Sequence, residues 1–163
     1  MRRVYLATTL AGLARAHASG VLTGPRPAHA VTAAVREWYV EGDQEELEYV
    51  ALTEAAERSL RELALDPELP RRRVVVAADV AEPDVRDVAD LRFRSAVVVA
   101  VDVPVSAIAS VHVDEEGAEK TIAEAISALP EADGGDDDAR FALDEAEATE
   151  LLWYDVSELG DLV

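Results

Sequence analysis

The 163 residues match the usual size of one domain, and half are hydrophobic, so a core can form without disulfides or metals. The sequence has no cysteine, which excludes thiol catalysis and thiolate zinc sites. A formal net charge of −19 argues against nucleic acid and membrane partners, since anionic surfaces would repel the chain. Without a long apolar segment or a signal-peptide pattern, the sequence predicts a cytoplasmic protein.

Strand and helix signals alternate along the chain, and polar or proline-containing segments separate them. Apolar and β-branched runs predict strands over residues 3–8, 28–31, 73–80, 96–103, 109–113 and 150–154. Apolar residues at helical spacing predict helices over residues 10–18, 33–41, 44–65, 118–129 and 141–147, with a terminal turn or helix at 156–162. These elements predict one compact α+β domain over residues 1–163, in which a mixed β-sheet of about five or six strands packs against helices.

Residues 130–138, Pro-Glu-Ala-Asp-Gly-Gly-Asp-Asp-Asp, predict an acidic, flexible loop. Their aspartates lack the spacing of an EF-hand loop. The chain also has no phosphate-binding glycine motif, nucleophile elbow or zinc-ligand histidine spacing. No motif therefore assigns a reaction or a cofactor, and we expect a protein that is not an enzyme.

An aspartate ends each of four predicted strands: Asp79, Asp102, Asp114 and Asp155. At one side of a parallel sheet, these carboxylates could hold Mg²⁺ or a cationic ligand. Only residues 104–108 separate two of the strands, too few for a parallel crossover, so Asp102 and Asp114 should lie at opposite ends. A metal-assisted hydrolase is kept as an alternative function, although strand termination and helix capping are the more common reasons for aspartates at such positions.

Arginines stand at the start of three predicted strands. They are Arg2 and Arg3, then Arg71, Arg72 and Arg73, and finally Arg92 and Arg94. If two of these strands were parallel neighbours, their arginines would form a cationic patch for a carboxylate or phosphate. The alternative is that they balance nearby carboxylates. Arg71, Arg72 and Arg73 are the candidate binding residues for a small anionic ligand or a protein partner.

Two Trp-Tyr pairs, Trp38-Tyr39 and Trp153-Tyr154, contain four of the chain's few aromatic residues. Adjacent side chains on a strand or helix face different ways, so each pair can place one ring in the core and leave the other near the surface. An exposed ring would mark a partner-binding face or a homodimer face. The sequence leaves both options open beside simple core packing.

Six segments spread over nearly the whole chain carry a resemblance to other proteins. They are residues 3–10, 30–39, 45–49, 73–80, 111–114 and 150–154. The segments are similar to a family of actinobacterial proteins of similar length, a domain of unknown function. This resemblance implies membership and nothing about chemistry.

The run Tyr5-Leu6-Ala7-Thr8, the later Gly20-Val21-Leu22 and Glu150 are similar in outline to the ADP-ribosyltransferase-like fold. That motif has a histidine that positions nicotinamide where this chain has Leu6, and leucine cannot donate the hydrogen bond. The similarity therefore implies a degenerate nucleotide binder. Our main expectation is a small accessory or regulatory protein that binds a protein partner or a small anionic ligand without a cofactor.

Overall fold

The strand β1 (Arg2–Thr8) lies at the centre of the sheet. In the computed structural model, which describes residues 1–163, β1 pairs with β3 (Arg26–His29) on one side and β4 (Val74–Val80) on the other. The outer strands are β5 (Val85–Asp87), β6 (Ala96–Val99), β8 (Ile108–Val113) and β9 (Leu152–Asp155). The strand order is β5-β6-β3-β1-β4-β8-β9, and a separate small sheet joins β2 (Val21–Leu22) to β7 (Val103–Pro104).

The predicted single α+β domain is confirmed, with a difference in the sheet. It has seven strands, and every neighbouring pair is antiparallel, where the sequence predicted a mixed sheet of five or six. The strand at 85–87 lies in a segment predicted as loop because three residues are too short for a periodic signal. Strand direction depends on pairing between distant segments, which hydrophobic patterns do not reveal.

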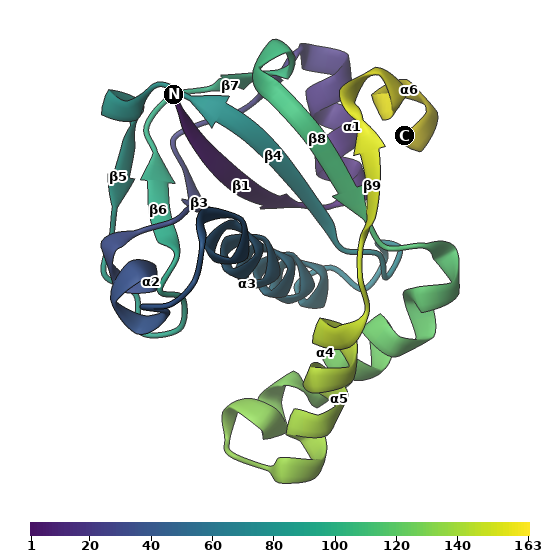
Figure 1. Ribbon diagram of the computed structural model, residues 1–163. Coiled ribbons are helices and arrows are strands. Elements are labelled where there is room, and N and C mark those ends of the chain that lie inside the picture. Colours follow the sequence, from purple (N-terminus) through teal and green to yellow (C-terminus); the bar gives the residue numbers. More distant parts are fainter.

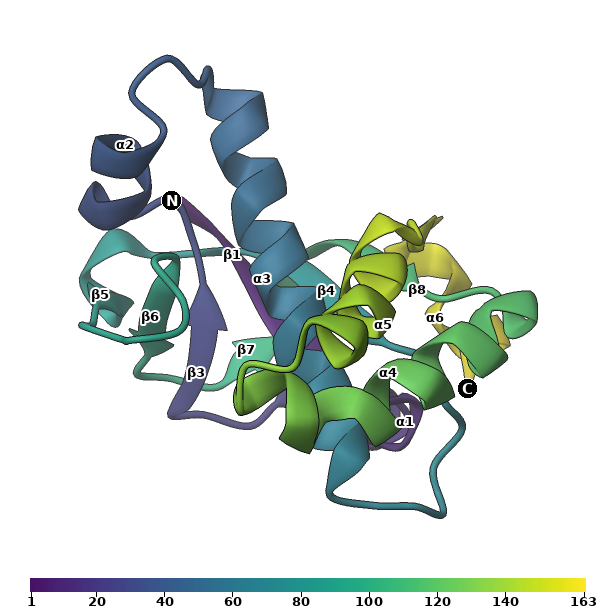
Figure 2. The ribbon, with the colours of Figure 1, turned by 90° about the horizontal axis from the view of Figure 1, so that it is seen from below.

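Helices cover both faces of the sheet unequally (Figure 1). The helix α3 (Gln44–Ala64) crosses one face, and α1 (Leu10–Ser19) with α6 (Leu159–Leu162) packs on the other. The short α2 (Ala33–Trp38) precedes α3, and α4 (Glu119–Asp133) forms a hairpin with α5 (Asp137–Ala148). Figure 2 shows this hairpin alongside α3.

Side chains that bond to free backbone amides set the helix starts. Thr9, Thr32 and Asp43 accept from the backbone amides of Gly12, Val35 and Glu46, so each caps its helix. Asp136 caps α5 in the same way. The predicted loop over 130–138 is shorter than expected, because α4 continues through Pro130 to Asp133.

The two faces of the sheet differ in what covers them. Val4 and Leu6 of β1 join the largest core cluster, on the α1 side, whereas Tyr5 packs against alanines of α3. Small residues on α3 let the helix lie close to the sheet. His112 and Trp153 are register partners on the α3 side, yet the side chain of Trp153 is 60% exposed. We call this part of the α3 side, formed by β8 and β9, the open face.

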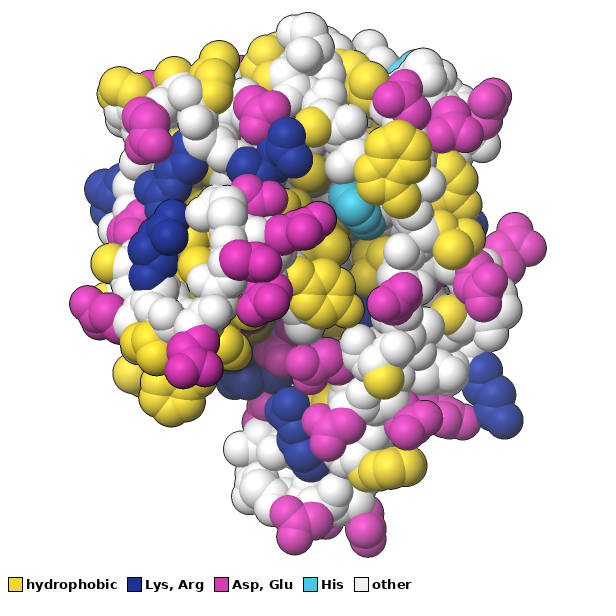
Figure 3. All heavy atoms as spheres, viewed as in Figure 1, with side chains coloured by type: hydrophobic (Ala, Val, Ile, Leu, Met, Phe, Trp, Pro, Cys, Tyr) yellow, Lys and Arg dark blue, Asp and Glu magenta, His cyan; other side chains and the backbone are white.

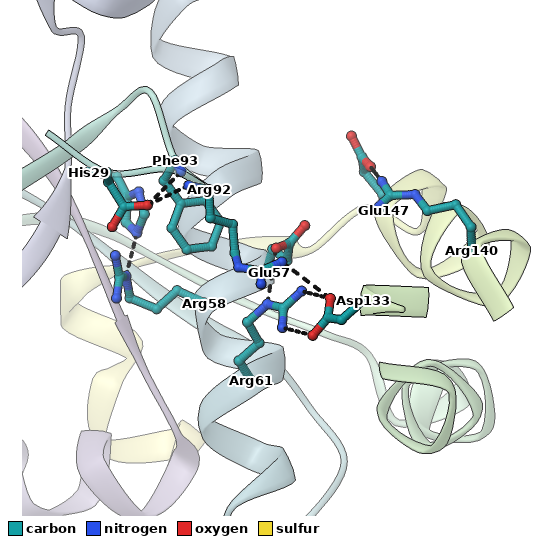
Figure 4. Close-up of polar contacts among 10 residues, drawn as sticks. His29, Glu57, Arg58, Arg61, Arg92, Phe93, Asp133, Arg140 and Glu147 are labelled. Atoms are coloured by element: carbon teal, nitrogen blue, oxygen red, sulfur yellow. Dashed lines mark hydrogen bonds and ion pairs between the residues drawn. The ribbon is translucent and has the colours of Figure 1, made fainter. Parts of the chain in front are cut away.

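A partly buried chain of hydrogen bonds joins β3, the start of β6 and α3. Arg58 Nε donates to His29 Nε2 at 2.8 Å, so the ring proton lies on Nδ1, which is 2.8 Å from Ser95 Oγ. Ser95 Oγ in turn donates to Glu54 Oε2 at 2.7 Å. Each donor in this chain has one acceptor. The Phe93 ring packs against the His29 ring in an edge-to-face arrangement (Figure 4). Burial, reinforced by the Arg58 charge, lowers the pKa of His29 to about 3.

The low pKa of His29 predicts that the stability of the protein depends on pH. The folded-state pKa of His29 lies below its usual 6.5, so the unfolded chain binds a proton first as the pH falls. Stability is therefore lost between about pH 6.5 and 3, and the step from pH 7 to 5 should cost about 2 kcal/mol at this residue.

Urea unfolding of the wild type and His29→Gln at pH 7 and pH 5 measures this term. We expect the loss of stability between the two pH values to shrink in His29→Gln. The half-buried His112, whose pKa is lowered by burial and by Arg3, provides the matched control, and His112→Gln should shrink the loss less. An unchanged pH dependence in His29→Gln would contradict the assignment.

Candidate functional site

The first predicted site residues to consider are Arg73 and Asp114, which form a buried ion pair. Arg73 Nε and Nη2 donate to the two carboxylate oxygens of Asp114, each at 2.8 Å, and the Arg73 backbone amide donates to the same carboxylate. The side chain of Asp114 is completely buried and that of Arg73 is 4% exposed. Arg73 Nη2 also donates to the carbonyl of Thr149. The pair therefore joins the start of β4, the end of β8 and the segment after α5.

The structure does not bring the four strand-end aspartates together. Asp79 accepts two hydrogen bonds from Arg3, its register partner on β1. Asp102 accepts from the backbone amide of Gly24, and Asp155 accepts from Ser157. No group of three or more His, Asp or Glu side chains is placed to hold a metal ion. The shared metal site considered above is not formed, because antiparallel strands place their last residues at opposite ends of the sheet.

The predicted cationic patch is also absent, since the strand-start arginines have internal partners. Arg71 donates to the carbonyls of Leu63 and Asp66 and so closes the end of α3. Arg72 donates to the carbonyl of Asp114. Arg2 pairs with Asp87, and Arg92 pairs with Asp133. These arginines hold segments together and do not form a free anion-binding surface.

A groove lies between α3 and α5, and it is lined by several polar groups that the contacts above do not involve. Two adjoining hollows share Thr53, Arg73 and Glu147. Together they are lined by Tyr49, Leu52, Thr53, Glu54, Ala56, Glu57, Leu60, Arg73, Arg140, Leu143, Ala146, Glu147, Thr149, Glu150 and Leu151. We call this surface the α3–α5 groove. Its lining includes Leu151, which directly precedes β9 of the open face.

The groove has an apolar floor and an acidic rim. Its lining contains four carboxylates and two guanidinium groups, and the Arg73 guanidinium is bound to Asp114. Arg140 on α5 pairs with Asp144 at 3.0 Å and approaches Glu147 at 3.8 Å. Figure 4 shows Arg140 and Glu147 on α5, across from Glu57 on α3. Negative charge therefore dominates the accessible rim.

Ionic contacts fix the α4–α5 hairpin beside α3. Arg61 donates to both carboxylate oxygens of Asp133, at 2.9 and 3.0 Å, and also to Glu57. These hydrogen bonds, with the charges of Arg61 and Arg92, lower the pKa of Asp133 to about 2. The carboxylate that anchors the hairpin is therefore ionised at neutral pH (Figure 4).

The open face carries polar groups that the sequence did not single out. Ser110 Oγ lies 2.9 Å from His112 Nε2, two residues further along β8. Tyr5 lies further along the sheet, on β1 and under α3, where burial, followed by the charge of Glu48, raises its pKa to about 12, so its hydroxyl stays protonated. The serine–histidine pair could support nucleophilic chemistry only with an acid that orients the ring, and no carboxylate bonds to His112. The groups instead offer neutral hydrogen-bonding positions. Only the alternation of Ser110 and His112 along one strand face could have indicated them.

Exposed aromatic rings border the groove and the open face. Tyr49 is 55% exposed and Trp153 is 60% exposed. Tyr154 faces the other way and packs against the main core, as predicted for adjacent residues on a strand. Figure 3 shows a histidine in a hollow between large hydrophobic side chains, with acidic side chains around it.

The Trp38-Tyr39 pair differs from Trp153-Tyr154 in the exposure of its rings. Trp38 and Tyr39 are both exposed, at 62% and 41%, where one ring was expected in the core. The six-residue α2 buries only Val35, so neither ring is turned inward. The guanidinium of Arg94 lies 3.7 Å from the centre of the Trp38 ring and covers one of its faces.

The protein is a single-domain α+β protein built on a seven-stranded antiparallel sheet. The chain belongs to the family of unknown function DUF6912, which matches residues 2–163. No functionally curated protein and no solved structure shows significant similarity to it. None of its helices is both long and apolar enough to cross a membrane.

The ion pairs at the strand ends should differ sharply in their contribution to stability. Asp114→Asn leaves the buried Arg73 guanidinium without its counter-charge and should lower the free energy of unfolding by about 3–5 kcal/mol. Asp79→Asn removes the partner of the more exposed Arg3 and should cost less than about 1 kcal/mol. Urea unfolding at pH 7 measures both, and equal costs would contradict the structural role of the buried pair.

Proposed function

We propose that this protein is a small accessory or regulatory protein that binds a basic, amphipathic segment of a protein partner. The observation that carries the proposal is the α3–α5 groove, whose apolar floor is bordered by exposed aromatic rings and an acidic rim. The segment would lie in this groove and reach the open face. The proposal places the protein in the cytoplasm, as its composition led us to expect.

The apolar part of the groove supports binding of a segment with apolar side chains. Leu52 and Leu151 are partly buried against the α3 side of the sheet, and Tyr49 and Trp153 stand nearby with more than half of each side chain exposed. Aromatic residues in such positions are the usual anchors of protein interfaces. A partner that covers them would remove apolar surface from water.

Charge supports a basic partner. Glu147 and Glu150 stand on the rim, and Glu150 has no arginine partner in the structure. The net charge of −19 would also attract a basic segment over a distance and speed its association. A helix-in-groove or extended mode would bring lysine or arginine to the rim while apolar side chains enter the floor.

The alternatives from the sequence have less support. The four strand-end aspartates each have a separate internal partner, so a metal-assisted hydrolase lacks its site. For the degenerate nucleotide binder, Glu150 lies in the groove at the far end of the chain from Thr8, which packs under α1 and α3.

The two tryptophans allow a direct test. Trp38→Phe leaves Trp153 as the lone tryptophan, whereas Trp153→Phe leaves Trp38, which lies outside the groove. A synthetic amphipathic helix of leucine and lysine is the probe, and a leucine–glutamate helix is its counterpart. We expect a saturable change in Trp153 fluorescence with the basic helix, a much smaller change in Trp38, and no binding of the acidic helix.

A pair of charge variants tests the rim. Glu147→Gln with Glu150→Gln should weaken binding about fivefold, since each rim charge contributes a fraction of a kcal/mol to about 1 kcal/mol. The matched control is Glu68→Gln with Glu131→Gln, which changes the net charge equally at exposed positions outside the groove. Equal weakening by both pairs, or an equal response of Trp38 and Trp153, would show attraction to overall charge and sink the proposal.

A further inference from the structure

A second pocket, on the α1 side of the molecule, has the opposite electrostatic character. It has a volume of about 580 Å³ and is formed by the end of β1, the helix α1, the strand β2 and the start of β3. Its lining is Thr8, Gly12, Arg15, Ala16, Ala18, Ser19, Val21, Leu22, Thr23 and Arg26. We call it the α1 pocket. It contains two arginines and no carboxylate, in a chain with 34 acidic and 15 basic residues.

Arg26 is partly buried, and its guanidinium forms no ion pair. Its guanidinium reaches only the carbonyls of Thr23 and Ala7, both at 3.4 Å. The charge of Glu62 on α3 favours the charged form of Arg26 and raises its pKa, but the two side chains form no ion pair. Burial lowers the pKa of Arg26, and the like charge of Arg15 adds to this effect. A bound anion would stabilise the charged guanidinium of Arg26 and so offset both the cost of burial and the repulsion by Arg15.

Arg15 contributes a second cation to the same pocket. It lies on the exposed side of α1 and forms no hydrogen bond or ion pair within the chain. It lines the same pocket as Arg26, and its charge helps to lower the pKa of Arg26. Two guanidiniums near one another, without a carboxylate between them, match the charge and hydrogen-bonding capacity of a phosphate group.

The remaining lining fits the rest of a small molecule. The exposed Thr23 and Ser19 supply hydroxyl groups at the mouth, and Val21 with Leu22 supplies apolar surface. A Cβ atom at Gly12 would collide with Thr8 Oγ1, so a larger residue here would force the Thr8 side chain to shift. The glycine thus lets α1 approach β1 and sets the shape of the pocket. Its volume lies in the range of small-molecule sites.

We propose that the α1 pocket binds a phosphate-bearing small molecule, with Arg15 and Arg26 as direct ligands of the phosphate. This site is separate from the α3–α5 groove, and none of its lining residues belongs to that groove. The protein would therefore take a small anion at one surface and a basic segment at another.

Titration calorimetry with inorganic pyrophosphate tests this proposal on the full chain. We expect one saturable site, and Arg15→Gln should weaken binding about tenfold, the effect of losing one charge-assisted hydrogen bond. Arg15 makes no internal contact, so this variant should fold normally. The matched control is Arg86→Gln, which removes an exposed, unpaired arginine on β5 and should leave the affinity unchanged.

Two further measurements locate and classify the ligand. Amide resonances of Gly12 and Thr23 should shift with pyrophosphate, whereas those of Glu147 and Glu150 in the groove should not. Citrate, a polycarboxylate of comparable charge, should bind at least about tenfold more weakly if the pocket selects phosphate. Absence of saturable binding, equal weakening by Arg15→Gln and Arg86→Gln, or preference for citrate would overturn the proposal. These readouts are independent of the basic-helix experiment.

Discussion

The buried ion pair between Arg73 and Asp114 is the contact on which much of the architecture depends. It satisfies two charges that would otherwise be very unfavourable in the core, and it does so with four hydrogen bonds that include the carbonyl of Thr149. Through these bonds, β4, β8 and the segment after α5 meet at one point. The groove wall formed by α5 is therefore anchored in the sheet core on one side.

The antiparallel sheet explains why charged residues at strand ends pair with one another. An antiparallel neighbour places its last residue opposite the first residue of the next strand, so an arginine at a start meets an aspartate at an end. Arg3 with Asp79 and Arg73 with Asp114 are two instances of this rule. The strand-start arginines and the strand-end aspartates, which the sequence presented as separate features, therefore pair with each other. The charges left for binding lie elsewhere.

Local features of the fold could be predicted from the sequence, and long-range features could not. Thr9, Thr32 and Asp43 were recognisable as caps because a cap and its helix are adjacent in the chain. The direction of the strands, the chain of bonds through His29 and the groove depend on residues far apart in sequence. Arg26 gave no signal in the sequence, since only the assembled structure shows that it lines a pocket with Arg15 and without a carboxylate.

The two proposed sites follow from the same distribution of charge. Most arginines are bound to carboxylates or carbonyls inside the fold, so the carboxylates that remain at the surface give the groove rim its negative character. Arg15 and Arg26 have no carboxylate partner, because α1 and the start of β3 approach each other where the lining carries no acidic residue. Glu62 is close enough to favour the Arg26 charge and still leaves its guanidinium without an ion pair. An anion at this point would complete on the α1 side the charge balance that Arg73 and Asp114 achieve in the core.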